Sequence, residues 1–352
     1  MRKFMMLLFA AMFMILVACS GSDGEGTDDG SSSGADDGEE VVLKFGTHLT
    51  EDHNLTLNAV VPWMEKVEEL TDGQVTFEHY PNSQLGAADD AYELVKSGTL
   101  DLGYTLYMEE ILPLMDFPML PDLYEDPEAG TAAYWAVLNQ EPFKGELEKI
   151  GLKPIMAVAW EPYTIGTVDV KPEKVEDIAK LKLRSSGGLH DEATAALGAT
   201  PVAISASESL EALRKNTVDG YWGSTTSWSD YQFTEVLQYG IKNLPLNGWG
   251  GVFTMNVDTY NSLPENVQEA IEIANEEMNE SLGKFIKEYT SVEAWEIAED
   301  EGMEIYEVSD DVVKEVKEIL APLTEKWLEE QDAAGYPATE IYEQFIEEYN
   351  NY

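Results

Sequence analysis

The stretch Lys180–Gly223 alternates short strand-like and helical patterns, and it limits the possible fold more than any other part of the chain. Three strand-like runs cover residues 181–184, 199–204 and 218–222, and two helical runs cover residues 189–197 and 206–213. Short breaks rich in Gly, Ser and Pro separate them. Strand–helix–strand–helix–strand within some forty residues predicts an α/β fold with a parallel sheet.

The first of these strands ends on an arginine. Arg184 stands directly before a Ser-Ser-Gly-Gly turn, and ligands of parallel sheets bind beyond the carboxyl ends of the strands. This position predicts that Arg184 binds a ligand, although pairing with a nearby acid such as Asp191 or Glu192 is the alternative. Further along, Ser205 and Glu208 have the spacing of a capping box at the start of the second helix.

The rest of the chain continues the alternation of strands and helices. Strands are predicted near residues 41–47, 75–78, 100–106, 152–160 and 303–306, and helices near residues 57–67, 91–95, 129–140 and 142–147, with two or three acidic helices at the end. Residues 264–300 carry one amphipathic pattern that lasts about eight turns. By itself this pattern is compatible with a coiled-coil arm or with a helix packed inside the protein.

The first forty residues have the composition of an exported, tethered protein. Arg2 and Lys3 precede an apolar run, Phe4–Ala18, which is typical of a signal peptide and too short to span a bilayer. The run ends at Cys19, the only cysteine, in the form of a lipobox, so we expect residues 1–18 to be removed and Cys19 to be lipidated. Residues 20–40 hold no large apolar side chain, and we expect 19–40 to be a disordered acidic linker.

The chain is strongly acidic. It has 21 Lys and Arg against 68 Asp and Glu, a net charge of −47. Loss of Arg2 and Lys3 with the signal peptide leaves 19 − 68 = −49. Such a charge disfavours nucleic acid and anionic lipid as partners and predicts self-repulsion that salt screens.

Several ordered segments resemble the solute-binding proteins of TRAP (tripartite ATP-independent periplasmic) transporters, of the dicarboxylate-binding DctP type. These segments are LKFGTHLTEDH (43–53), TDGQVTFEHYPNSQLG (71–86), LVKSGTLDLGY (94–104), LKLR to TVDG within 181–220, and TMNVDTYNSLPENVQEAI (254–271). The resemblance covers roughly residues 41–350. Several motifs in the same order are more specific than any one of them.

The resemblance implies a two-lobed fold like that of periplasmic binding proteins, with a ligand cleft between the lobes and a long helix packed along both. It implies lobe I at about 41–155 and 245–280, and lobe II at about 156–244 and 281–350. It also implies that Arg184 holds a solute carboxylate through a two-pronged salt bridge. The chain departs from the family at Glu161–Thr164, where many members carry Gly-Phe-Arg, and at Trp222-Gly223, where members often carry Glu-Asn.

Six further residues are predicted to line the ligand site with Arg184, because they lie near strand ends or domain crossings. They are His48, Tyr107, Trp160, Trp222, Gly223 and Trp249. Replacement of Glu-Asn by Trp222-Gly223 favours a more apolar pocket. Aromatic residues near a domain interface also serve as plain packing, and histidines in loops often make only local hydrogen bonds.

No sequence motif indicates catalysis or a cofactor. The chain has no GxGxxG, GxxxxGK[ST] or HExxH, its one GxSxG match (Gly30–Gly34) lies in the linker of small and acidic residues, and its four histidines show no metal spacing. We therefore expect a binding protein without cofactor or metal, and not an enzyme. An ABC-type or sensor-linked solute-binding lipoprotein is the alternative, and an extracytoplasmic lipoprotein hydrolase is a third possibility.

The resemblance also sets expectations for mechanism and partners. The lobes would close around a small carboxylate-containing solute and deliver it to TRAP membrane subunits driven by an ion gradient. We expect a monomer that is tethered through its lipid to the outer face of the cell membrane.

Overall fold

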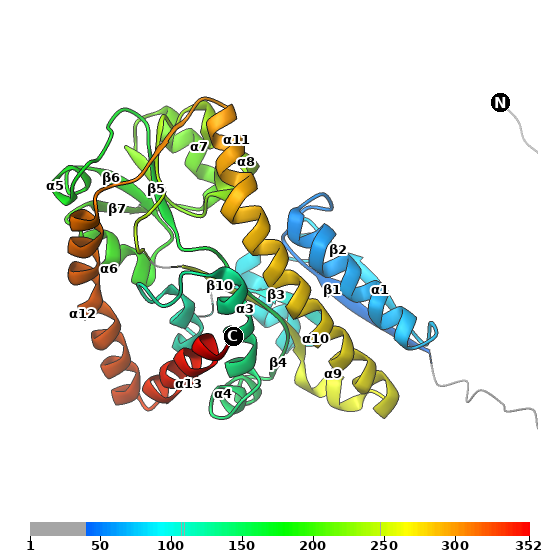
Figure 1. The fold of residues 1–352 in the computed structure, drawn as a ribbon. Coiled ribbons are helices and arrows are strands. Elements are labelled where there is room, and N and C mark those ends of the chain that lie inside the picture. The colour runs from blue at the N-terminus through cyan, green and yellow to red at the C-terminus, as the bar shows by residue number, and fades with distance from the viewer. Residues whose placement is uncertain (1–39, 107, 109, 247) are drawn as a thin grey trace, which may run out of the picture. The chain divides into compact units, whose positions relative to one another are not determined.

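The structure is a computed structural model that describes residues 40–106, 108, 110–246 and 248–352. Its strands form two mixed sheets, with helices packed around each (Figure 1). The prediction of a two-lobed α/β fold is thereby confirmed. The predicted signal peptide (1–18), the linker up to residue 39 and Tyr107 lie outside the described residues.

The first sheet has the strand order β2-β1-β3-β10-β4. Its strands are β1 (Val41–Gly46), β2 (Val75–Tyr80), β3 (Leu102–Thr105), β4 (Leu152–Ala159) and β10 (Gly250–Asn256). β1 pairs in parallel with β2 and β3, and β10 runs antiparallel between β3 and β4. β4, which matches the strand predicted near residues 152–160, leads through residues 160–163 into β5 of the second sheet.

The second sheet has the strand order β11-β9-β5-β8-β6-β7. Its strands are β5 (Thr164–Thr167), β6 (Lys182–Ser185), β7 (Thr200–Ala203), β8 (Gly220–Gly223), β9 (Tyr239–Ile241) and β11 (Glu304–Tyr306). β8, β6 and β7 are parallel neighbours, which confirms the parallel unit predicted for Lys180–Gly223. β5 is antiparallel to β8 and β9, so the whole sheet is mixed.

Helices cover both sheets. They are α1 (Val61–Leu70), α2 (Ala91–Lys96), α3 (Pro127–Leu138), α4 (Phe143–Lys149), α5 (Val175–Ile178), α6 (Gly188–Ala196), α7 (Ala206–Arg214), α8 (Thr226–Asp230), α9 (Val257–Ser262), α10 (Glu265–Glu288), α11 (Ala294–Asp300), α12 (Asp310–Ala334) and α13 (Ala338–Asn351). In the described ranges no helix combines the length and the apolar character needed to cross a bilayer.

Residues 264–300, which carry the amphipathic pattern, form one long helical rod whose apolar face packs along both sheets. α10 continues through a π-helical turn, η5 (Tyr289–Glu293), into α11 (Figure 1). α10 packs on α1, α3 and β4 of the first sheet, and α11 packs on α8 and β11 of the second. This confirms the helix packed along both lobes. The coiled-coil alternative is wrong, because the stripe faces the protein's own sheets, although Val292 of the stripe is exposed.

Two buried asparagines fix α10 against β4 and α1. Asn279 accepts a hydrogen bond from the Ala157 backbone N–H at 2.8 Å and donates to the Ile155 carbonyl at 3.3 Å. The pairing of β4 with β10 shifts register at this point, so the asparagine satisfies backbone groups that the ladder leaves open. Asn275 accepts from the Trp63 indole at 2.9 Å and ties α1 to the same rod.

Three local differences from the expectations have simple causes. Leu57 is exposed, because a π-helical turn (η1, Thr56–Val60) precedes α1 and shifts the apolar stripe. Ser205 precedes α7 as predicted, but its hydroxyl donates to the Glu208 carboxylate at 2.7 Å instead of capping the helix backbone. α13 packs on α3, which covers the first sheet, whereas the predicted lobe bounds place residues 281–350 in lobe II. Those bounds stay a prediction.

Candidate functional site

A cavity of about 320 Å³ opens between the strand ends of the two sheets. Its walls come from residues 48–55, β3 and its end, the crossing after β4, the end of β6, and α8 with the residues around it. The lining residues are His48, Leu49, Thr50, His53, Leu55, Tyr104, Leu106, Trp160, Tyr163, Arg184, Ser186, Ala206, Tyr221, Ser224, Thr226, Ser227, Asp230, Tyr231 and Trp249. The position fits the rule that α/β sheets bind ligands at strand ends.

Arg184 lies in this cavity with only 6% of its surface exposed. Its Nε donates to the Ile204 carbonyl at 2.8 Å, and one terminal nitrogen donates to the Trp222 carbonyl at 3.4 Å. The guanidinium carbon lies 4.9 Å from the centre of the Tyr221 ring, which is a cation–π contact. These contacts hold the guanidinium fork in one orientation at the carboxyl end of β6.

The acids considered as partners of Arg184 bind elsewhere. The Asp191 carboxylate accepts from the Ser185 hydroxyl, and Glu192 pairs with Lys326 at 2.7 Å. Among the described residues, no carboxylate oxygen lies within 4.0 Å of an Arg184 nitrogen. The guanidinium therefore keeps its positive charge in a mostly enclosed place without an ion pair from the described part of the chain.

Aromatic side chains make much of the remaining wall. Trp160 and Trp249 line the cavity, together with Tyr163, Tyr221 and Tyr231. His48 also lines it and stacks on Tyr104, with 5.6 Å between ring centres. Burial lowers the pKa of His48 to about 4, so its imidazole is neutral at ordinary pH. The walls thus offer flat, mostly uncharged surfaces to a ligand.

Two predicted residues lie behind the wall instead of in it. Trp222 is fully buried and packs edge to face on His190, with its carbonyl turned to Arg184. Gly223 is buried in β8, where an added Cβ would lie 2.5 Å from the Tyr221 ring. Neither belongs to the lining. Successive residues of a strand alternate between the two faces, so Trp222 points away from the face of Tyr221, which lines the cavity, and the Tyr221 ring covers Gly223.

Several lining residues escaped the sequence analysis. Tyr104, Ser224, Thr226 and Asp230 contribute to the cavity without having been chosen. Ser224 and Thr226 follow the end of β8, and Tyr104 lies near the end of β3, so the strand-end rule that identified Arg184 would also have identified them. Asp230 lies at the last turn of the short helix α8, and no sequence pattern marks it.

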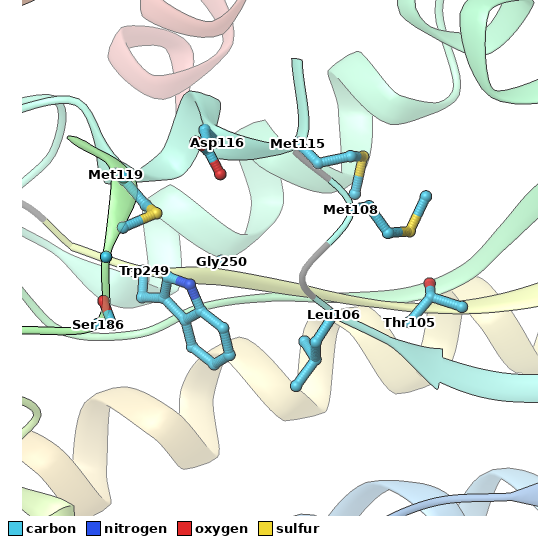
Figure 2. A pocket seen from close by; sticks show the side chains of 11 residues that line it. Thr105, Leu106, Met108, Met115, Asp116, Met119, Ser186, Trp249 and Gly250 are labelled. Carbon is cyan, nitrogen blue, oxygen red and sulfur yellow. The ribbon is translucent and has the colours of Figure 1, made fainter. Parts of the chain in front are cut away.

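A second, smaller cavity of about 40 Å³ adjoins the first. Figure 2 shows Met108, Met115 and Met119 around it. Leu106, Ser186 and Trp249 line both cavities and so form the partition between them. This volume is close to that of one or two water molecules, and the flexible methionine side chains make its shape adaptable.

The polar and aromatic side chains of the cavity indicate what it can bind. In the part of the chain that the structure describes, no group of three or more His, Cys, Asp or Glu side chains is placed to hold a metal ion. A fixed guanidinium, aromatic walls and a few hydroxyls can recognise a small organic anion and hold it in one orientation.

Comparisons with known proteins agree with this picture. The family model "Bacterial extracellular solute-binding protein, family 7" (DctP) matches residues 45–331. The C4-dicarboxylate-binding periplasmic protein DctP of Rhodobacter capsulatus is 27% identical over 300 residues, covering 83% of this chain and 87% of the relative. An outer membrane transporter protein, TsaT of Comamonas testosteroni, is 25% identical over 305 residues, covering 84% and 87%.

Solved structures share the fold. A TRAP periplasmic solute-binding protein from Desulfovibrio salexigens, in an open complex, has a TM-score of 0.79 and 25% identity, covering 89% of this chain and 97% of its own. A marine metagenome TRAP solute-binding protein specific for aromatic acid ligands has a TM-score of 0.80 at 22% identity, covering 89% and 99%. With the family model matching most of its length, this chain belongs to the DctP family of bacterial extracellular solute-binding proteins.

Proposed function

We propose that this protein is the extracytoplasmic receptor of a TRAP transporter and captures a small organic solute through the solute's carboxylate. The observation that carries the proposal is Arg184: it lies in the cavity, 6% exposed, without a carboxylate partner among the described residues. The family's role as solute-binding receptors, which are not enzymes, supports the same reading.

Enclosing the Arg184 guanidinium without a partner of opposite charge costs free energy. A guanidinium removed from water needs hydrogen-bonded partners of opposite charge, and two backbone carbonyls supply only part of that need. A carboxylate matches the planar fork and forms two parallel N–H···O bonds with it. The ligand's carboxylate would therefore supply the missing partner.

Closure of the two lobes is the proposed capture step. The cavity is lined from both sheets, and residues 160–163 cross from β4 to β5 at its edge. A hinge at such crossings lets two rigid sheets enclose a ligand. We propose that the closed form is then recognised by the TRAP membrane subunits, and that the receptor acts as a monomer.

Ligands of related structures point to the same chemical class. A Rhodoferax ferrireducens TRAP solute-binding protein holds benzoate, one from Bordetella bronchiseptica holds mandelate, and Bordetella pertussis DctP6 binds pyroglutamic acid. Each of these ligands is an acid. These proteins are at most 22% identical to this chain, so they support the class of ligand and leave its identity to experiment.

The experiment is calorimetry on arginine variants. Benzoate, mandelate, pyroglutamate and succinate serve as probes, after a thermal-shift screen ranks them. Arg184→Ala is expected to lose about 2 to 5 kcal/mol of binding free energy, roughly 30-fold to several thousand-fold in affinity. Arg184→Lys is expected to lose at least tenfold, because an ammonium lacks the planar fork.

Arg214→Ala is the matched control. Arg214 is exposed at the end of α7, pairs with Glu235 and lies outside the cavity lining. Its loss should leave affinity within twofold. Parental affinity in a folded Arg184→Ala protein would remove Arg184 from the site and defeat the proposal.

A further inference from the structure

We infer that the solute carries a cationic nitrogen as well as its carboxylate, and that Asp230 receives this cation. The inference rests on the proposed function, since it assigns the part of the solute that lies away from Arg184. It narrows the ligand class from organic acids in general to zwitterions.

The charged groups of the cavity carry the argument. Among the lining residues of the described chain, Arg184 is the only Lys or Arg, and Asp230 is the only Asp or Glu. Arg184 comes from the end of β6, and Asp230 from the end of α8. They are not within 4.0 Å of each other, so one cavity presents two separate charges of opposite sign.

Asp230 has no cationic partner within the described residues. Its carboxylate accepts from the Tyr289 hydroxyl at 3.5 Å, a long and weak hydrogen bond from the π-helical turn η5. By contrast, the carboxylates of Asp126 and Glu128 both pair with the ammonium group of Lys287 on the same helical rod, at 2.6 and 3.1 Å. Asp230 differs from the other unpaired acids of the surface because it faces a cavity.

The surroundings of Asp230 favour a cation over a second anion. The side chain is open to solvent at the mouth, yet protein atoms around it still raise its pKa to about 6 by desolvation. At neutral pH the carboxylate is ionised and incompletely solvated, so a cation beside it would be stabilised. A second carboxylate there would meet like charge, which disfavours dicarboxylates.

The neighbouring side chains do not supply that positive charge themselves. Burial lowers the pKa values of His48 and His53, so both imidazoles are neutral at pH 7. Tyr231, Tyr163 and Trp160 are instead aromatic faces in the same lining, and such faces attract ammonium groups. Carboxylate and aromatic walls together form an environment suited to an organic cation.

Matched pairs of probes test the inference. The two members of each pair have nearly the same shape and differ in the cationic nitrogen: 4-(aminomethyl)benzoate with 4-methylbenzoate, and L-proline with cyclopentanecarboxylate. Calorimetry at pH 7.5 is expected to show that the zwitterion of at least one pair binds ten times more tightly than its simple acid. Asp230→Asn should abolish that preference, so that the zwitterion and the simple acid of the pair bind within about twofold of each other.

Two further variants make the result specific. Asp230→Glu keeps the charge and should keep most of the preference, whereas Asp169→Asn removes an exposed aspartate outside the lining and should change nothing. Thermal melts confirm that each variant is folded. If the simple acids bind as well as the zwitterions, or if Asp230→Asn keeps the preference, the inference is overturned.

The same data separate this inference from the proposed function. Simple acids that bind in an Arg184-dependent way without any gain from the cation would defeat only the role of Asp230. If no carboxylate in any pair binds, the proposed function fails and the inference falls with it.

Discussion

The Glu161 carboxylate accepts hydrogen bonds from the backbone N–H and the side-chain hydroxyl of Thr225, each at 2.9 Å. Glu161 follows β4 of the first sheet, and Thr225 follows β8 of the second. The Ser224 hydroxyl donates to the same oxygen at 2.7 Å. This buried carboxylate therefore ties the crossing between the sheets to the floor of the cavity, at the place where many family members carry Gly-Phe-Arg instead.

Replacement of Glu161 by glutamine should stabilise the protein at high pH. Burial raises the pKa of Glu161, so the native state keeps the proton to higher pH than the unfolded chain does. Stability from this group is therefore present at low pH and is lost as pH rises from about 4.5 through the raised pKa. Glutamine mimics the protonated form, so the melting temperature of Glu161→Gln relative to the parent should increase between pH 5 and 8.

Glu161→Ala separates charge from hydrogen bonding. It removes the oxygen that accepts hydrogen bonds from three donors, and the buried Thr225 N–H then lacks this acceptor. We expect the free energy of unfolding to fall by about 1 to 3 kcal/mol at every pH. Melting curves of all three proteins across the pH range make the comparison. If the difference in melting temperature between Glu161→Gln and the parent stays constant with pH, the carboxylate does not titrate as described.

Gly251→Ala should damage both stability and binding. A Cβ at this position in β10 would lie 2.1 Å from the Tyr104 hydroxyl oxygen. Tyr104 is stacked on Phe253 at 4.2 Å and on His48, so its ring has little room to move. We expect a loss of about 1 to 3 kcal/mol in unfolding free energy, measured with urea, and weaker binding of the probes.

Gly145→Ala is the control for this substitution. Its Cβ would meet the far end of the flexible Glu141 side chain at 2.7 Å, inside helix α4, where alanine is favoured over glycine. Stability should stay equal or rise. If Gly251→Ala were as stable as Gly145→Ala, the close packing of Tyr104 on β10 would not be a constraint.

Salt should stabilise the fold. Acids outnumber bases by 68 to 21, and most of the ion pairs are exposed, so each contributes little. Between tens of millimolar and about 1 M NaCl the Debye length falls to roughly 3 Å, which screens the repulsion more than it weakens these pairs. The unfolding midpoint, followed by circular dichroism, should rise; a flat or falling midpoint contradicts the prediction.

Cys19→Ser should release the protein from the membrane. Cys19 lies outside the described residues, and its lipidation is proposed from the lipobox and the acidic segment that follows. Fractionation of cells that express the parent and the variant, with mass spectrometry of the parent's N-terminus, provides the measurement. The anchor assignment fails if both proteins stay with membranes equally.

Local sequence was sufficient for the parallel unit around β6. Breaks at Ser-Ser-Gly-Gly and the change of hydrophobic period mark each element there, and these signals are short-range. The same holds for the rod of residues 264–300, whose stripe is long enough to survive the π-helical turn. The position of Arg184 in the cavity followed from the general rule for strand ends.

Other features of the site depend on pairs far apart in the chain. Glu161 and Thr225 are 64 residues apart, and nothing in either local sequence announces their contact. Asp230 has no distinguishing pattern, and the chain holds 68 acids, so its place in the cavity is visible only in three dimensions. Trp222 was predicted in the lining, but packing against His190 turns it into the core.

By itself, the sequence determined the α/β class, the order of the elements, the long amphipathic helix and the arginine at the end of β6. Periodicity and turn residues act over a few positions, so one chain segment is enough to reveal them. Only the tertiary structure decided which side chains surround the cavity and that Arg184 lacks a carboxylate partner among the described residues. Those facts depend on how two sheets and a shared helix bring distant strand ends together, and the free energy of that packing is spread over contacts that no local pattern records.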